Sequence, residues 1–372
     1  MKAQRVAPPL LLLRACSARE VVQRHLAHLR GRFESAGWRV VAGTNEGHVG
    51  RSVIACVDDP WLEPLPEQLA ALAEVSAGPQ WRVPGVLGLD GPQGWHPRVA
   101  PASRLEYERV AVGRPGGSRP RVLTGAWPGV AVAPADAAEP LLRRGWPPTG
   151  GEVVLVPWVR MFRYHDPAAH ARLELDPFIP DTARAILDVG CGAGLLGGRH
   201  RRPGRIVIGI EPDWELARSA AARLDAVIPA AAAVALSALA PRFDCIVFAD
   251  VLEHMVDPVA ALAGAASLLT ADGTIVVSLP NAAWIPILTA LTAGRWDPTV
   301  AGVQARDHLF FTTPISFGAI AAEAGLEVVR SLPLAAPASW RQRLCAGALA
   351  AVFGTSHETL LAAQFVAVLR RR

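Results

Sequence analysis

Three glycines at alternate positions, Gly190, Gly192 and Gly194, constrain this chain more than any other feature of its 372 residues. They follow a short apolar run, 186–187, that ends in an acid, Asp188. Glycine adopts positive φ angles at little cost, so such a turn lets the backbone approach a ligand closely and directs the N–H groups of the following helix at it. The pattern therefore predicts a buried strand, a ligand-binding turn and a helix in an α/β domain.

The glycine spacing distinguishes two classes of nucleotide-binding turn. The nicotinamide fingerprint G-x-G-x-x-G would require a glycine at position 195, where this chain has Leu195. The spacing here is G-x-G-x-G, with an acid two residues before the first glycine. This pattern resembles the first motif of the class I S-adenosylmethionine-dependent methyltransferases.

The order of the downstream elements extends the resemblance. A second apolar strand is predicted at 205–210 and ends in Glu211, 23 residues after Asp188. A carboxylate at this strand end suits a ribose, because it accepts hydrogen bonds from both hydroxyls. A third strand at 243–248 leads into the segment 249–258, and a helix over 259–269 and a turn at 271–273 precede a fourth strand at 274–278. The final antiparallel strand of that fold is expected at 364–369.

The resemblance implies a Rossmann-like seven-stranded methyltransferase sheet that binds S-adenosyl-L-methionine. Many relatives carry an acid that binds adenine after the strand at 226–228, whereas this chain has Pro229 followed by alanines. The cofactor-binding residues that the resemblance implies are Asp188, Gly190, Cys191, Gly192, Gly194, Glu211, Asp250, Val251 and Leu252.

Methyl transfer from a sulfonium mainly requires alignment of the acceptor, the methyl carbon and the sulfur, but a hydroxyl acceptor also needs a base. His254 and His308 are the candidate bases, because imidazole titrates near neutral pH. The alternatives are that His254 binds backbone at a helix start and that His308 is a structural contact beneath a loop. Asp250 and Glu253 could instead orient the cofactor or the substrate. The five cysteines have no metal-ligand spacing, and no metal site is expected from the sequence.

A narrower resemblance covers residues 279–330, with Pro280, Asn281, Gly294, Gly302 and the segment 307–312. These residues are similar to a bacterial subgroup of methyltransferases whose members accompany, or are fused to, glycosyltransferases of surface-polysaccharide synthesis. The resemblance implies a hydroxyl on a glycan or glycan precursor as acceptor and an association with glycan-assembly enzymes. A sugar hydroxyl, a lipid-linked glycan and a small aromatic molecule all remain open as acceptors.

The first half of the chain opens with a predicted strand at 9–13, a helix at 17–33 with Ser17 as N-cap, and a strand at 38–42. A third strand at 52–57 ends in Asp58 and Asp59, and a helix is predicted at 65–73. This arrangement resembles a shortened GT-A glycosyltransferase, in which such acids hold a divalent metal. It departs from that pattern at Pro60 and lacks the acidic catalytic segment between 126 and 151. The prolines and glycines of 78–130 predict loops.

Three domain ranges follow: a degenerate glycosyltransferase-like α/β domain at 1–166, a linker at 167–180 and a methyltransferase domain at 181–372. Besides an active methyltransferase, two other functions stay open. One is a sugar-nucleotide glycosyltransferase with a vestigial methyltransferase, and the other is a non-catalytic scaffold in glycan assembly.

Composition narrows the class of partner. The formal net charge is +4 and the arginines are scattered, so nucleic acid is not an expected partner. No apolar run reaches the length of a membrane span. The apolar run 7–13 is too short for a signal peptide and is followed by Arg14, so a cytoplasmic location is expected.

Overall fold

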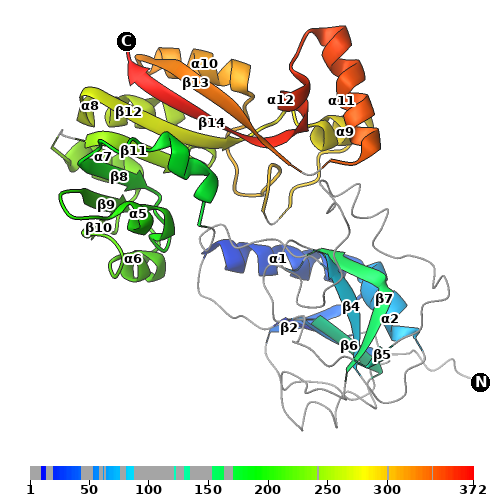
Figure 1. Ribbon diagram of the computed structural model, residues 1–372. Coiled ribbons are helices and arrows are strands. Elements are labelled where there is room, and N and C mark those ends of the chain that lie inside the picture. The colour runs from blue at the N-terminus through cyan, green and yellow to red at the C-terminus, as the bar shows by residue number, and fades with distance from the viewer. Residues whose placement is uncertain are drawn as a thin grey trace, which may run out of the picture. The chain divides into compact units, whose positions relative to one another are not determined.

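The computed structural model divides into two compact units, Met1–His165 and Asp166–Arg372. The structure describes residues 10–13, 20–42, 53–57, 62, 64–75, 81–87, 121–122, 130–134, 153–162, 171–240, 243–299, 301–336 and 338–372. Each unit contains its own seven-stranded sheet and its own core (Figure 1).

The N-terminal unit has a mixed sheet in the order β2-β1-β3-β6-β4-β7-β5. Strand β1 pairs in parallel with β2 and β3, whereas β6 is antiparallel to both β3 and β4. Two helices accompany the sheet, α1 (Glu20–Ser35) and α2 (Pro66–Ala73). The strands are β1 (Leu10–Leu13), β2 (Arg39–Ala42), β3 (Val53–Val57), β4 (Trp81–Leu87), β5 (Arg121–Val122), β6 (Val130–Pro134) and β7 (Val153–Phe162).

The core of this unit lies between the sheet and its helices. Leu11 and Leu13 alternate along β1, while Leu29 and Phe33 lie one helical turn apart on α1, and all four are buried in one cluster. Phe33 also makes an edge-to-face contact with Trp38, with 5.5 Å between ring centroids. The spacing of these apolar residues thus accounts for the predicted strand–helix–strand opening.

The prediction of loops over 78–130 is wrong where strands occur. This range contains β4, β5 and the first residue of β6. Trp81 and Val83 are fully buried, and burial of their side chains outweighs the local preference for turns. Pro84 and Gly85 lie where the register of β4 with β7 shifts, which is where a strand tolerates such residues. The residues Ser17, Asp58, Asp59 and Pro60 lie outside the described part of the chain.

The C-terminal unit has the sheet order β10-β9-β8-β11-β12-β14-β13, in which β14 is antiparallel to both of its neighbours. This order is the predicted Rossmann-like sheet closed by an antiparallel final strand. The strands are β8 (Ala185–Val189), β9 (Ile206–Ile210), β10 (Ala226–Ile228), β11 (Phe243–Ala249), β12 (Leu269–Pro280), β13 (Leu326–Ala335) and β14 (Ala362–Arg371).

Side chains alternate between the two faces of this sheet, as the two-residue period of a strand requires. In β11, Ile246 and Phe248 pack with α7 (Ala232–Ala238), α8 (Pro258–Leu268) and α10 (Pro314–Glu323). Cys245 and Val247 point to the other face and pack with α5 (Leu195–His200) and α6 (Trp214–Ala220). Helices therefore cover both faces, and the strand ends are left to build a site.

One further group of helices completes the unit. The helix α9 (Ile285–Thr292) packs with α11 (Trp340–Phe353) and α12 (His357–Leu361) around a small apolar cluster. The predicted turn at 271–273 falls inside β12, where the register with β11 moves from Leu269 directly to Thr274.

Among the described residues, no helix is long and apolar enough to cross a membrane.

The range 167–180, expected as a linker, is described from residue 171 onward. It forms a short 3-10 helix, η2 (Leu173–Phe178), whose Leu175 is fully buried. Leu175 and Ile179 pack against the face of the sheet that α5 and α6 cover. Residues 171–180 are thus part of the C-terminal unit, because their apolar side chains complete its core.

Candidate functional site

The glycine turn lies between β8 and α5, at the carboxyl end of the parallel strands. Gly190, Gly192 and Gly194 all have positive φ, at 69°, 53° and 76°. A Cβ on Gly190 would lie 2.5 Å from a methyl group of Val251, so this position also requires the absence of a side chain. The turn is held against the second strand, because the N–H groups of Gly190 and Cys191 both donate to the carbonyl of Ile210.

The two acids at the strand ends are each bound to backbone N–H groups. Asp188 Oδ2 accepts from the N–H of Gly197 at 3.2 Å, and Glu211 accepts from Gly192 and Asp213, both at 2.9 Å. Burial raises the pKa of Asp188 to about 7, and the nearby negative charge of Glu211 acts in the same direction. Glu211 therefore holds the glycine turn from one side, while Asp188 anchors the first turn of α5.

Asp250, at the end of β11, is the centre of a partly buried polar network. Its φ is +57°, which is rare for a residue other than glycine. The carboxylate pairs with Arg172, accepts from the hydroxyl of Ser278 at 2.9 Å and accepts from the amide of Gln364 at 3.1 Å. Arg172 also has positive φ and donates to the same hydroxyl. The network holds the backbone in this strained conformation and directs Val251 against the glycine turn.

Three of the residues predicted to bind the cofactor differ in what their side chains contact. The side chain of Leu252 is fully buried in the apolar core. Cys191 packs beneath the turn, and its burial raises the pKa of its thiol well above the ordinary value. Val251, partly buried, is the member of this group that touches the glycine turn.

The two candidate bases lie together, although 54 residues separate them in the sequence. The rings of His254 and His308 meet edge to face, with 4.8 Å between centroids. His254 Nδ1 donates to the carbonyl of Asp307 at 3.2 Å, and His308 Nδ1 donates to the carbonyl of Val303 at 3.1 Å. Because a carbonyl only accepts, both Nδ1 atoms carry hydrogen, and in the neutral form of either ring the lone pair is on Nε2.

His308 is held in place by backbone hydrogen bonds. The N–H groups of Leu309 and Phe310 both donate to the carbonyl of Glu253, at 2.7 and 3.1 Å. Burial, together with the neighbouring His254, lowers the pKa of His308 to about 4. At neutral pH the His308 ring is therefore uncharged, and its lone pair is free for a proton or a ligand.

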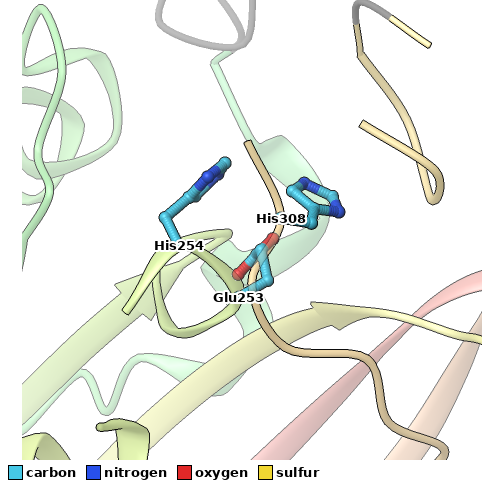
Figure 2. A group of neighbouring side chains, drawn as sticks. All are labelled: Glu253, His254 and His308. Atoms are coloured by element: carbon cyan, nitrogen blue, oxygen red, sulfur yellow. The ribbon is translucent and has the colours of Figure 1, made fainter. Parts of the chain in front are cut away.

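Glu253 lies beside these two rings, in the short 3-10 helix η3 (Leu252–His254). Figure 2 shows the two imidazoles on either side of its carboxylate. The residue is 1% exposed, and neither carboxylate oxygen has a hydrogen-bond partner in the described part of the chain. Burial raises the pKa of Glu253 to about 8.

The structure thus brings the predicted residues into two neighbouring groups. The residues of the glycine turn, Asp188 and Glu211 form one, and His254 with His308 forms the other. Sequence reasoning missed Arg172, Ser278 and Gln364, which surround Asp250 from three separate segments. No local pattern marks these three. Asp257 is the N-cap of α8, since its carboxylate accepts from the N–H of Ala260 at 2.8 Å.

Comparisons with known proteins identify a methyltransferase domain in this chain. Residues 161–331 match a family model described as a methyltransferase domain. A ubiquinone biosynthesis O-methyltransferase of Cereibacter sphaeroides is 30% identical over 179 residues, which cover 46% of this chain and 72% of that protein. Another protein of the same name, from Alkalilimnicola ehrlichii, is 34% identical over 157 residues, covering 40% of this chain and 62% of that protein.

A solved structure of a TehB-like S-adenosylmethionine-dependent methyltransferase from Corynebacterium glutamicum aligns with 56% of this chain and 90% of its own. Its sequence identity is 22% and its TM-score is 0.36. The residues matched by the family model include the glycine turn and both strand-end acids. The chain therefore belongs to the class I S-adenosylmethionine-dependent methyltransferases, with its methyltransferase domain in the C-terminal half and S-adenosyl-L-methionine as cofactor.

Proposed function

We propose that the enzyme transfers the methyl group of S-adenosyl-L-methionine to a hydroxyl on a ring-shaped acceptor, and that this acceptor is a glycan or glycan precursor. The observation that supports a hydroxyl as the acceptor is the pair of Nε2 lone pairs on His254 and His308. His254 follows closely on Val251, which touches the glycine turn. A hydroxyl becomes a good nucleophile only when its proton is removed. The lone pair of His254 can accept that proton, whereas His308, whose pKa is lowered to about 4, is the weaker base. The curated relatives named above are O-methyltransferases as well.

An aromatic pair beside His308 supports a ring-shaped acceptor. Trp296 and Phe311 meet edge to face at 4.9 Å between centroids, and Phe311 lies 6.1 Å from the ring of His308. Both aromatic side chains are partly open to solvent, at 39% and 40% exposure. Exposed aromatic faces of this kind bind the apolar face of a sugar or a planar ring.

The roles of the site residues follow from their places. The glycine turn, Asp188, Glu211 and the segment 250–252 are proposed to bind the cofactor. The group around His254 and His308 is proposed to deprotonate the acceptor. Cytoplasmic location and association with glycan-assembly enzymes belong to the same proposal and rest on the sequence.

The test of the acceptor class uses isotopically labelled S-adenosylmethionine and two acceptor sets. One set consists of extracted surface glycans and their precursors, and the other consists of catechols and hydroquinones. Label that appears in a glycan methyl ether supports the proposal. Label that enters only the phenols would keep O-methylation and overturn the glycan acceptor. If S-adenosylmethionine fails to bind in calorimetry, the chain would be the non-catalytic scaffold instead.

For the N-terminal unit we propose a degenerate GT-A domain that docks a partner or the substrate without transferring sugar. Its test is a titration with a nucleotide sugar in the presence of manganese. No manganese-dependent binding is expected. Binding that disappears in Asp59→Ala would instead establish the glycosyltransferase alternative.

A further inference from the structure

Three potential metal ligands lie close together near the carboxyl ends of the parallel strands. One ligand atom each from Glu253, His254 and His308 lies within 4.8 Å of the others (Figure 2). Glu253 and His254 come from η3, and His308 comes from a loop more than 50 residues later. The tertiary structure alone assembles this group.

Glu253 gives the first reason to infer a ligand. Buried polar groups in folded proteins almost always have hydrogen-bond partners, because desolvating an unpaired polar group costs free energy. Glu253 is buried, and both of its carboxylate oxygens lack a partner within the described residues. The carboxylates of Asp188, Glu211 and Asp250, which lie at the same edge of the sheet, all accept hydrogen bonds. Glu253 is the exception among these acids.

The two imidazoles give the second reason. Each has Nδ1–H bound to a backbone carbonyl, that of Asp307 for His254 and that of Val303 for His308. This is the arrangement that fixes the tautomer of a metal-binding histidine and leaves Nε2 as the ligand atom. The two rings are thus prepared to bind through the same nitrogen.

We propose that Glu253, His254 and His308 form a binding site for a divalent first-row metal ion of the zinc type, and that this ion activates the acceptor hydroxyl. The second half of this statement rests on the proposed O-methyltransferase function. Two imidazoles and one carboxylate suit zinc and its neighbours better than magnesium or calcium, which prefer oxygen ligands alone. The positive ion would also neutralise the buried Glu253 carboxylate.

The geometry requires only small adjustments. Ligands about 2.0–2.2 Å from a tetrahedral zinc ion lie roughly 3.4 Å apart. One ligand atom from each residue now lies within 4.8 Å of the others, so the ligand atoms need to approach by up to about 1.4 Å, which side-chain rotation can supply. Asp250 is not available as a fourth ligand, because Arg172 and Gln364 already bind its carboxylate. A position therefore stays open for an exogenous oxygen.

That open position has a direct use in methyl transfer. A hydroxyl bound to the ion releases its proton to solvent more readily, since the metal stabilises the resulting oxyanion. The oxyanion attacks the methyl carbon, a C–O bond forms, and the C–S bond breaks with its electron pair left on sulfur. The products are the methyl ether and neutral S-adenosylhomocysteine. In the metal-bound enzyme the two histidines act as ligands, and the ion takes over the role of the base.

Cobalt provides the probe, because Co²⁺ accepts the same ligands as zinc and absorbs visible light. The full chain, without a polyhistidine tag and treated with a chelator, is titrated with Co²⁺ and then with Zn²⁺. One equivalent of Co²⁺ should produce visible absorption bands, and Zn²⁺ should displace them. Glu253→Gln and His308→Ala should each abolish the bands. His357→Ala, at a partly exposed histidine on α12, is the matched control and should keep them.

Two further measurements keep the outcomes distinct. Calorimetric titration of each variant with S-adenosylmethionine, without metal, tests whether the cofactor site is still folded. If Glu253→Gln fails to fold, the Co²⁺ titration of His308→Ala is the test of the metal site. This variant is expected to fold because His308 lies in a partly exposed loop. The absence of saturable Co²⁺ binding, or bands that persist in both variants, would overturn the metal site. Absent S-adenosylmethionine binding would instead overturn the proposed function and leave the Co²⁺ result valid.

Discussion

The two groups proposed to bind the cofactor and the acceptor, called here the cofactor side and the acceptor side, are built on different principles. On the cofactor side, Asp188 and Glu211 are both satisfied by backbone N–H groups of the turn and helix that they support. On the acceptor side, Glu253 has no such partner among the described residues, and two imidazoles present free lone pairs beside it. The first group is complete within the protein, while the second is complete only with a proton, a metal ion or a substrate.

This contrast implies different responses to mutation. Changes on the cofactor side should disturb binding and local structure together, because the same hydrogen bonds serve both. Changes on the acceptor side should alter the reaction while leaving the cofactor in place. The four predictions below test that separation, from the largest effect to the smallest.

Gly190→Ala should abolish S-adenosylmethionine binding. The new Cβ would lie 2.5 Å from Val251, at a residue whose φ is +69°. Gly204→Ala is the matched control, since Gly204 has a φ of +77° but open space where a Cβ would lie. Both variants carry a left-handed alanine, which costs about 1–2 kcal/mol of stability. Calorimetry should find cofactor binding only in the control, and equal affinities would refute the close packing of the turn.

His254→Ala should lower turnover by about 100-fold or more with cofactor affinity nearly unchanged, as expected for a group that acts in the transition state. The measurement compares kcat with the calorimetric Kd for S-adenosylmethionine. The same change at His308 should cost less unless its loop closes over the acceptor. Near-normal turnover of His254→Ala with an established acceptor would leave alignment as the whole mechanism.

Glu211→Gln should weaken S-adenosylmethionine binding by about 1–3 kcal/mol, the usual cost of removing a charged hydrogen-bond acceptor. The amide keeps one oxygen, so the variant retains one of the two bonds to Gly192 and Asp213. Glu215→Gln, on the exposed first turn of α6, provides a control with the same chemistry. A Glu211→Gln enzyme with native affinity would show that the carboxylate supports the fold alone.

The pH dependence of stability should distinguish Glu253 from an ordinary acid. Burial raises its pKa in the folded state from 4.5 to about 8, with Arg172 opposing the shift and Asp307 adding to it. Between these values the folded state binds more protons than the unfolded state, so this residue lowers stability as pH rises from about 4.5 to 8. Glu253→Gln should therefore lose less stability than the native chain over that range, in denaturation experiments with a chelator present. Parallel curves would mean that Glu253 keeps its ordinary pKa.

The sequence determined much of the cofactor side. Alternating apolar residues, the glycine spacing and the acids at strand ends are local signals, and they fixed the strands β8, β9 and β11 and the turn between β8 and α5. The N-cap at Asp257 is equally local, since it involves residues three positions apart. Such features are readable because a short segment contains both the side chain and the backbone group it binds.

The tertiary structure decided the acceptor side and the support of Asp250. Arg172 reaches Asp250 from 78 positions earlier, and Gln364 reaches it from 114 positions later. His308 meets Glu253 only because the loop after α9 donates two backbone hydrogen bonds to the Glu253 carbonyl. In the N-terminal unit, the insertion of β6 between β3 and β4 and the burial of Trp81 likewise depend on distant strands. Each of these contacts forms because packed layers bring remote segments together. The local sequence around one residue of such a contact does not predict which residue it will meet.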